Sequence, residues 1–278
     1  MQKTNGDQDG GQIAMKRNVK LLMLSVLLAA MAYGQESQSK ALAYSADKAN
    51  VPDAIAKVKS GHFALVHVDM IAKAGAVEAV PILEEQFSRS QDPLVKAKIA
   101  SALVKLGDKD DIYWDFLAKQ ASSALESDAP DFMNFDSQSN TAAGPSAEFV
   151  AWAKAHNVSP ESAGNDSIYW LPGKVLLLGL SGDPRAIPLL RRALLSPNHM
   201  IENAAATGLA ELQDKDSIPF IIDACKKAPP AAAALIAESL IYFDDAEAKK
   251  AVDTYVTEGR AKTLREARAQ GKRTPLSY

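Results

Sequence analysis

The sequence predicts an all-α fold, a right-handed α-solenoid in which about five short helical hairpins stack side by side. Three observations predict it: a motif that returns at a fixed spacing, helical apolar stripes between its copies, and a composition with 47% hydrophobic but only 6% aromatic residues. The spacing, 31 residues, is typical of repeat arrays, whose units are too small to bury their apolar faces alone.

The repeated motif begins in a turn and runs into the first turn of a helix. Residues 182–190 read GDPRAIPLL, and residues 213–221, which lie 31 positions later, read QDKDSIPFI. Asp183 and Asp214 suit helix N-caps, because a carboxylate can accept the free amide hydrogens of a first turn. The later proline falls within the opening turn, where it removes no helical hydrogen bond. Each copy therefore marks the start of a first helix.

Apolar stripes precede or follow the motif and predict the second helices. The same 4, 4, 3 spacing occurs at Val95, Ile99, Leu103 and Leu106, at Ile201, Ala205, Leu209 and Leu212, and at Ala232, Ile236, Leu240 and Phe243. This spacing places each set on one face of a helix. Each unit thus consists of two short antiparallel helices, and the abundant alanines allow the helix axes to approach closely.

This pattern resembles the HEAT-repeat family, in its short form similar to the repeats of phycobilin lyases. The resemblance is carried by GDPRAIPLL at 182–190 and by IENAAATGLAEL at 201–212, which is close to the family's V-R-x-A-A-A-x-A-L-G-x-L run. It covers roughly 51–126 and 167–256. It implies an array of HEAT-like hairpins, and it leaves the activity open, because such arrays scaffold, bind and occasionally catalyse.

The first 34 residues predict an N-terminal extension and a secretory signal peptide. Residues 15–20 (MKRNVK) are basic, and the apolar run that follows at 21–32 is about a dozen residues long, whereas a membrane span needs about 20. The small residues Ala32 and Gly34 suit cleavage. We expect translation to start at Met15, and a secreted or periplasmic protein without stable membrane insertion after cleavage. A retained membrane anchor is the alternative.

The remaining chain divides into a polar lead-in, a repeat domain and a tail. We predict these at 35–50, 51–270 and 271–278. Within the repeat domain, residues 246–270 read as one charged helix that caps the last repeat.

Residues 127–166 interrupt the period and predict an insertion between the two helices of one repeat, at 112–125 and 168–179. A short helix is expected at 147–156, with Ser146 as its N-cap. The aromatic residues gather here: Phe132, Phe135, Phe149, Trp152, Tyr169 and Trp170. They form either a satellite core that attaches the insertion to the array or an anchor for a partner. Asp131, Asn134 and Asp136 lack the spacing of a calcium loop and predict a solvated turn.

The sequence predicts no catalytic, cofactor-binding or metal-binding residue. It contains no G-x-S-x-G or G-x-x-x-x-G-K motif, and no histidine is followed by the glutamate that iron-binding HEAT hydroxylases pair with it. His67 is expected to be a buried structural histidine, and the single cysteine, Cys225, a buried inert thiol. The net charge of −3 excludes a basic field for nucleic acid.

The favoured interpretation is an exported, non-catalytic scaffold or adaptor that binds a protein partner through its concave face or its insertion. The candidate partner-binding residues are Trp152, Trp170, Lys98, Glu202, Asn203 and Glu238, of which the last four are expected on an exposed concave side. Two alternatives stay open. One is a phycobilin-lyase-like or other small-ligand-handling enzyme, and the other is a passive structural module of an envelope assembly.

Overall fold

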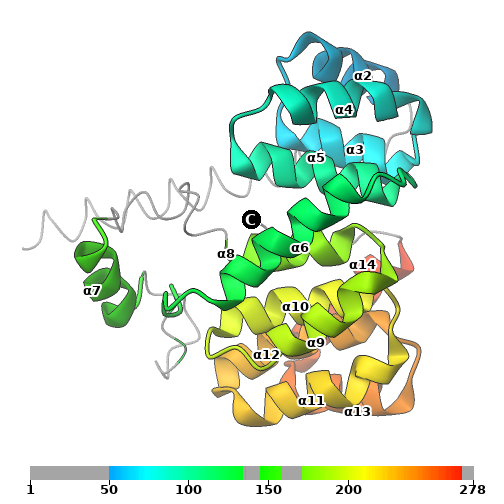
Figure 1. Ribbon diagram of the computed structural model, residues 1–278. Coiled ribbons are helices and arrows are strands. Elements are labelled where there is room, and N and C mark those ends of the chain that lie inside the picture. Colours follow the sequence, from blue (N-terminus) through cyan, green and yellow to red (C-terminus); the bar gives the residue numbers. More distant parts are fainter. Residues whose placement is uncertain (1–49, 134, 136–144, 158–170, 271–278) are drawn as a thin grey trace, which may run out of the picture. The chain divides into compact units, whose positions relative to one another are not determined.

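The computed structural model describes residues 50–133, 135, 145–157 and 171–270, which all belong to the unit Lys48–Tyr278. These residues form thirteen α-helices and four short 3-10 helices, with one isolated β-bridge and no strand (Figure 1). The predicted all-α fold of helical hairpins is confirmed. The signal-peptide region, the tail and Trp170 lie outside the described residues.

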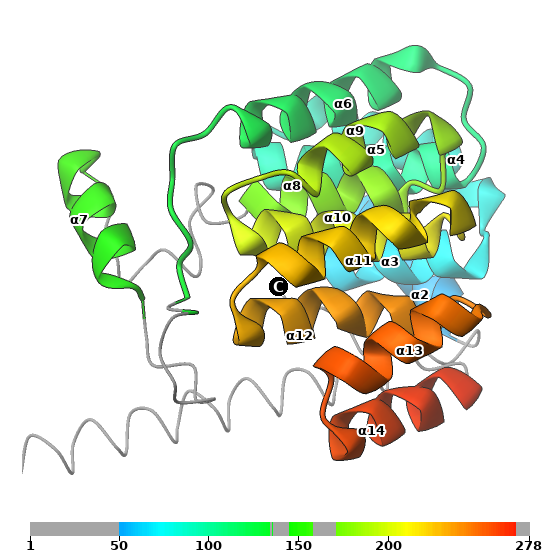
Figure 2. The same ribbon diagram turned by 90° about the horizontal axis from the view of Figure 1, so that it is seen from below.

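The helices of the array pair in chain order into antiparallel hairpins. The pairs are α2 (Val51–Ser60) with α3 (Leu65–Ala74), α4 (Val80–Arg89) with α5 (Pro93–Lys105), α6 (Asp111–Leu125) with α8 (Leu171–Leu180), α9 (Ile187–Ala193) with α10 (His199–Glu211), α11 (Ile218–Lys227) with α12 (Pro230–Glu238), and α13 (Ala246–Tyr255) with α14 (Glu258–Ala269). The second helices α3, α5, α8, α10 and α12 contact one another in that order and form one layer (Figures 1 and 2).

A left-handed residue followed by a 3-10 turn opens several of the first helices. Gly182 has a φ of 74° and Gln213, 31 residues later, has a φ of 54°. Short 3-10 helices follow, η3 (Pro184–Ala186) and η4 (Lys215–Ser217), and a proline occupies the opening turn of α9 and of α11. The recurring motif in the sequence is therefore the link between one hairpin and the next.

The two aspartates of the motif behave differently. Asp183 caps its turn as predicted, since its carboxylate accepts the amide of Arg185 at 2.8 Å. The same prediction is wrong for Asp214, whose side chain makes no cap bond. Its carboxylate instead pairs with Arg191 at 2.8 Å and accepts the hydroxyl of Ser217.

The predicted apolar stripes form the core. Ile99 and Leu103 on α5, Ile201 and Leu209 on α10, and Ile236 on α12 are all buried. One continuous cluster of buried side chains runs from α2 to α14. The helix axes approach most closely where α8 crosses α10, because a Cβ on Gly179 would lie 2.3 Å from the Cα of Gly208.

The C-terminal segment differs from the single helix predicted at 246–270. The chain leaves the helical conformation at Val256, which is extended and buried, so that two helices, α13 and α14, form instead of one. The break allows Ala261 and Leu264 of α14 to turn toward the core, where both are buried. Burial of apolar side chains thus overrides the uniform polarity of the sequence.

Two predictions for single residues are confirmed. His67 is buried, and its Nδ1 accepts the backbone amide of Ala64 at 2.9 Å. Cys225 is buried, and burial, with the charge of Glu202, raises the pKa of its thiol to about 12.

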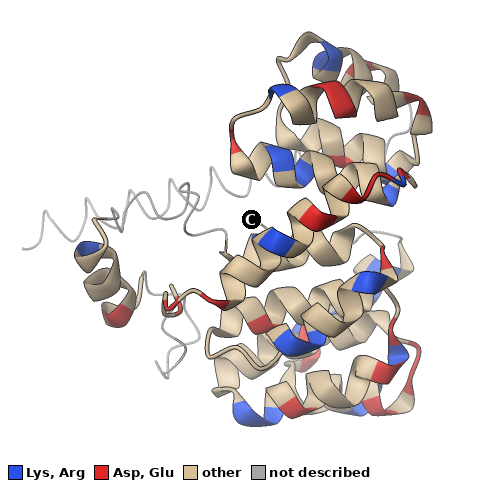
Figure 3. Ribbon diagram, viewed as in Figure 1, with Lys and Arg blue, Asp and Glu red and all other residues tan. Residues whose placement is uncertain are grey.

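Charged residues of both signs are interspersed along the helices (Figure 3). In the part of the chain that the structure describes, no helix has the length and apolar character to cross a membrane.

Candidate functional site

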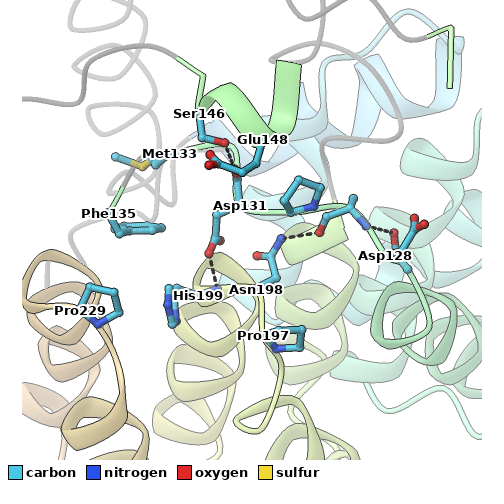
Figure 4. A pocket seen from close by; sticks show the side chains of 13 residues that line it. Asp128, Asp131, Met133, Phe135, Ser146, Glu148, Pro197, Asn198, His199 and Pro229 are labelled. Atoms are coloured by element: carbon cyan, nitrogen blue, oxygen red, sulfur yellow. Dashed lines mark hydrogen bonds between the residues drawn. The ribbon is translucent and has the colours of Figure 1, made fainter. Parts of the chain in front are cut away.

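A cavity lies where the start of the insertion meets the N-terminus of α10 (Figure 4). Its volume is about 360 Å³. Its lining residues are Ser127, Asp128, Ala129, Pro130, Asp131, Met133, Phe135, Ser146, Glu148, Pro197, Asn198, His199 and Pro229. They come from the segment after α6, the start of α7 (Ala147–Ala155), the turn before α10, and the turn before α12.

Asp131 attaches the insertion to α10. Its carboxylate accepts the backbone amides of His199 at 3.0 Å and of Met200 at 3.1 Å, the first amides of that helix. These amides have no helical partner, and the helix N-terminus favours a negative charge. Burial raises the pKa of Asp131, and the two amide hydrogen bonds oppose that shift. The solvated turn predicted for Asp131 is therefore wrong.

Asn198 reinforces the same junction from the other side. Its Oδ1 caps α10 by accepting the amides of Met200 and Ile201 at 3.1 Å, while its Nδ2 donates to the carbonyl of Ala129 at 3.2 Å. The side chain is buried, so that both halves of its amide are used. The pattern of an asparagine ahead of an apolar helical stripe was the signal in the sequence that could have placed this cap.

His199 and Glu202 form a pair on the first turn of α10. Nδ1 of His199 lies 2.7 Å from Oε2 of Glu202, and the imidazole stands edge-on to the ring of Phe135, with 5.7 Å between the ring centres. Glu202 is only 6% exposed. Its predicted place on an open surface is wrong, because its carboxylate folds back onto the histidine one turn earlier.

Ser146 links the start of α7 to the segment that carries Asp131. Its Oγ donates to the carbonyl of Asp131 at 2.6 Å and accepts the amide of Phe149 at 3.0 Å, so it is the predicted N-cap. Glu148 follows in the first turn of α7 and is exposed at the cavity rim. Figure 4 shows its carboxylate close to Ser146 and on the same side of the cavity as Asp131.

Trp152 ties α7 to the segment after α6. Its indole Nε1 donates to Oδ1 of Asp128 at 2.9 Å, and its ring stacks on His156 with 4.4 Å between ring centres. Phe149 and Ala153 form a small apolar cluster, against which Phe132 and Trp152 pack, and Trp152 also packs against the main core. Trp152 is thus a half-buried internal contact of the insertion, as in the satellite core that the sequence also allowed.

The other described candidates, Lys98, Glu238 and Asn203, do not line this cavity. Lys98 pairs with Asp69 of α3 at 2.8 Å, and Glu238 makes two 2.8 Å bonds to Arg260 of α14, so both are held by neighbouring hairpins. Asn203 is 2% exposed, which contradicts its predicted exposure. The physical reason is that α8, α9 and α12 all pack on α10.

Most of the polar side chains that line the cavity are engaged in contacts within the junction itself. Asp131, Asn198 and Ser146 form hydrogen bonds that join the insertion to α10 and α7. His199 is paired with Glu202. Among the residues the structure describes, no three histidine, cysteine, aspartate or glutamate side chains gather as metal ligands.

Part of the array matches a known protein family. The family model described as HEAT repeats matches residues 175–241, from α8 through η5 (Ser239–Tyr242). This segment consists of HEAT repeats. The match includes α10 and the turn before α12, which line one side of the cavity, whereas the segment after α6 and helix α7 lie outside it. HEAT repeats are typical of protein-interaction scaffolds. No curated protein and no solved structure matches the chain.

Proposed function

We propose that the protein is an exported scaffold that binds a protein partner and carries out no chemistry itself. The observation that carries the proposal is the HEAT array at 175–241 with an insertion attached to one of its helices by Asp131 and Asn198. In solenoids, insertions into a repeat often supply the binding face.

Polar contacts between different hairpins support a rigid array. Lys105 of α5 pairs with Glu211 of α10 at 3.0 Å, and Ser101 of α5 donates to the carbonyl of Leu177 on α8 at 2.8 Å. Arg185 ahead of α9 pairs with Asp111 of α6 at 2.8 Å and lies over the ring of Trp114. A preorganised surface of this kind binds without first losing conformational entropy.

The exported location rests on the basic and apolar pattern at 15–34. Export favours a scaffold of the cell envelope or the exterior over a pigment-handling enzyme, which would work in the cytosol. A purely passive structural module of the envelope is the alternative. A protein partner that contacts the insertion would favour the scaffold over this alternative.

Site-specific photo-crosslinking in the producing organism tests the proposal. Benzoylphenylalanine replaces Val150 on α7, which is 39% exposed, or Val77 in η2 (Val77–Ala79), which is 60% exposed. We expect a discrete protein adduct from position 150 and none from position 77. Adducts from neither position would contradict a partner at the insertion, and an adduct from position 77 alone would move the binding surface to the other end of the chain.

A further inference from the structure

The cavity at the insertion has a one-sided charge. Asp128, Asp131 and Glu148 line it, and none of its described lining residues is a lysine or arginine. The one cationic candidate, His199, is paired with Glu202, so its protonation would be matched by a carboxylate. A ligand that enters this cavity therefore meets carboxylates, with no lysine or arginine among the described lining residues to neutralise them.

The three carboxylates are not equally engaged. Asp131 accepts two backbone amides, and Asp128 uses one oxygen on the indole of Trp152. Glu148 is exposed at the rim and forms no ion pair with any described residue. Glu148, with the second oxygen of Asp128, is therefore the charge available to a ligand.

Part of the remaining wall is apolar. Phe135, Met133, Pro197 and Pro229 line the cavity beside the carboxylates, and Figure 4 shows the Phe135 ring between Pro229 and Asp131. A small polar cation would leave these surfaces uncovered. A ligand with an apolar stem and a cationic end matches both parts of the wall.

We propose that this cavity binds an arginine side chain of the protein partner, an inference that rests on the proposed function. The guanidinium stacks on an aromatic ring and forms paired hydrogen bonds to a carboxylate, while its methylene stem packs on apolar surface. The volume of about 360 Å³ also accommodates the backbone next to that side chain, since ligand cavities of about 300 Å³ upward hold more than a single side chain.

The test uses the full chain and a capped pentapeptide with one central arginine between serine and glycine residues. Binding is followed by ¹H–¹⁵N NMR, with the indole signal of Trp152 and the amides of His199 and Met200 as reporters. We expect saturable shifts at these three signals, which weaken as salt rises from about 0.05 to 0.5 M. The same peptide with citrulline, which has the shape of arginine without its charge, is expected not to shift them.

Matched variants assign the effect to the cavity. Glu148 and Glu247 are both exposed and each follows an alanine in the first turn of its helix. Glu148→Gln is expected to weaken peptide binding about fivefold, as for the loss of one partly exposed ion pair, and Glu247→Gln to leave it unchanged. Equal binding by both variants, or by the citrulline peptide, would overturn the proposal.

A further arm distinguishes a protein ligand from a free small cation. Spermidine that shifts the reporters while the arginine peptide does not would overturn the assignment to a protein side chain. The photo-crosslinking at position 150 distinguishes failure of the arginine cavity from failure of the scaffold function. An adduct that forms equally with Glu148→Gln would refute the arginine cavity and leave the scaffold function intact.

Discussion

At the scale of residues, the junction between insertion and array depends on a few capping side chains. Asp131 and Asn198 supply hydrogen-bond acceptors for the first amides of α10, and Ser146 does the same for α7. The sequence allowed Ser146 to be predicted, because its target lies three residues away. It did not allow Asp131 to be predicted, since its target amides lie 68 and 69 residues away and no local pattern relates them.

The charge state of Asp131 gives the first prediction. A carboxyl whose pKa is raised by folding contributes most stability below its unfolded pKa, and that contribution is lost as pH rises through the folded pKa. The free energy of unfolding of the protein relative to Asp131→Asn should therefore decrease between about pH 3 and pH 6. Urea unfolding at a series of pH values measures it, with the exposed Asp244 as the Asp→Asn control. A difference that grows with pH would contradict the burial of Asp131.

A pair of leucines tests the predicted stripe. Leu209 is 0% exposed and Leu195 is 74% exposed. Leu209→Ala should lower the free energy of unfolding by about 2–5 kcal/mol, because it leaves a cavity in a packed core. Leu195→Ala should change it by less than about 0.5 kcal/mol. Chemical unfolding followed by circular dichroism compares the two, and equal losses would mean that the stripe does not face the core.

At the scale of elements, the repeat spacing and the apolar stripes were enough to predict which helices pair. They did not predict which polar residues the packing of neighbouring helices buries. The motif placed the starts of α9 and α11 and the stripes placed α5, α10 and α12, because these depend on spacing within about a dozen residues. The surface assigned to α10 was wrong. Glu202 and Asn203 have the polarity of exposed residues, yet both are buried on a helix against which α8, α9 and α12 pack, and only the tertiary packing shows this.

The crossing of α8 and α10 gives the element-scale prediction. Gly179→Ala would place a Cβ 2.3 Å from the Cα of Gly208, a backbone atom that cannot rotate away. We expect a loss of stability of about 1–3 kcal/mol from overpacking. Gly259→Ala in α14 meets nothing within 4 Å and should stabilise by up to about 1 kcal/mol through helix propensity. Urea midpoints that move in the same direction for both variants would refute the close crossing.

At the scale of the whole molecule, the proposed export depends on the N-terminal segment. The basic and apolar pattern at 15–34 predicts cleavage after Ala32 or Gly34. N-terminal sequencing and intact mass of protein from the producing organism should give a chain that starts at Tyr33 or Gln35. An uncleaved chain recovered from the cytosol would contradict export.

The central claim is that the array stands without the insertion, and that the insertion supplies the partner's binding surface. The continuous core runs through the array helices, while Phe149 and Ala153 of α7 form a cluster of their own. One deletion that keeps Asp131 and its hydrogen bonds to α10 should therefore weaken partner binding without unfolding the array.

The most direct measurement is the affinity of the crosslinked partner for a variant in which a short glycine–serine bridge replaces residues 132–157. We predict a folded helical protein, verified by circular dichroism, whose affinity for the partner is at least about tenfold weaker, as expected when a binding hot spot is removed. A folded variant that binds with full affinity would contradict the account, and a variant that unfolds would show the insertion to be a structural part of the array.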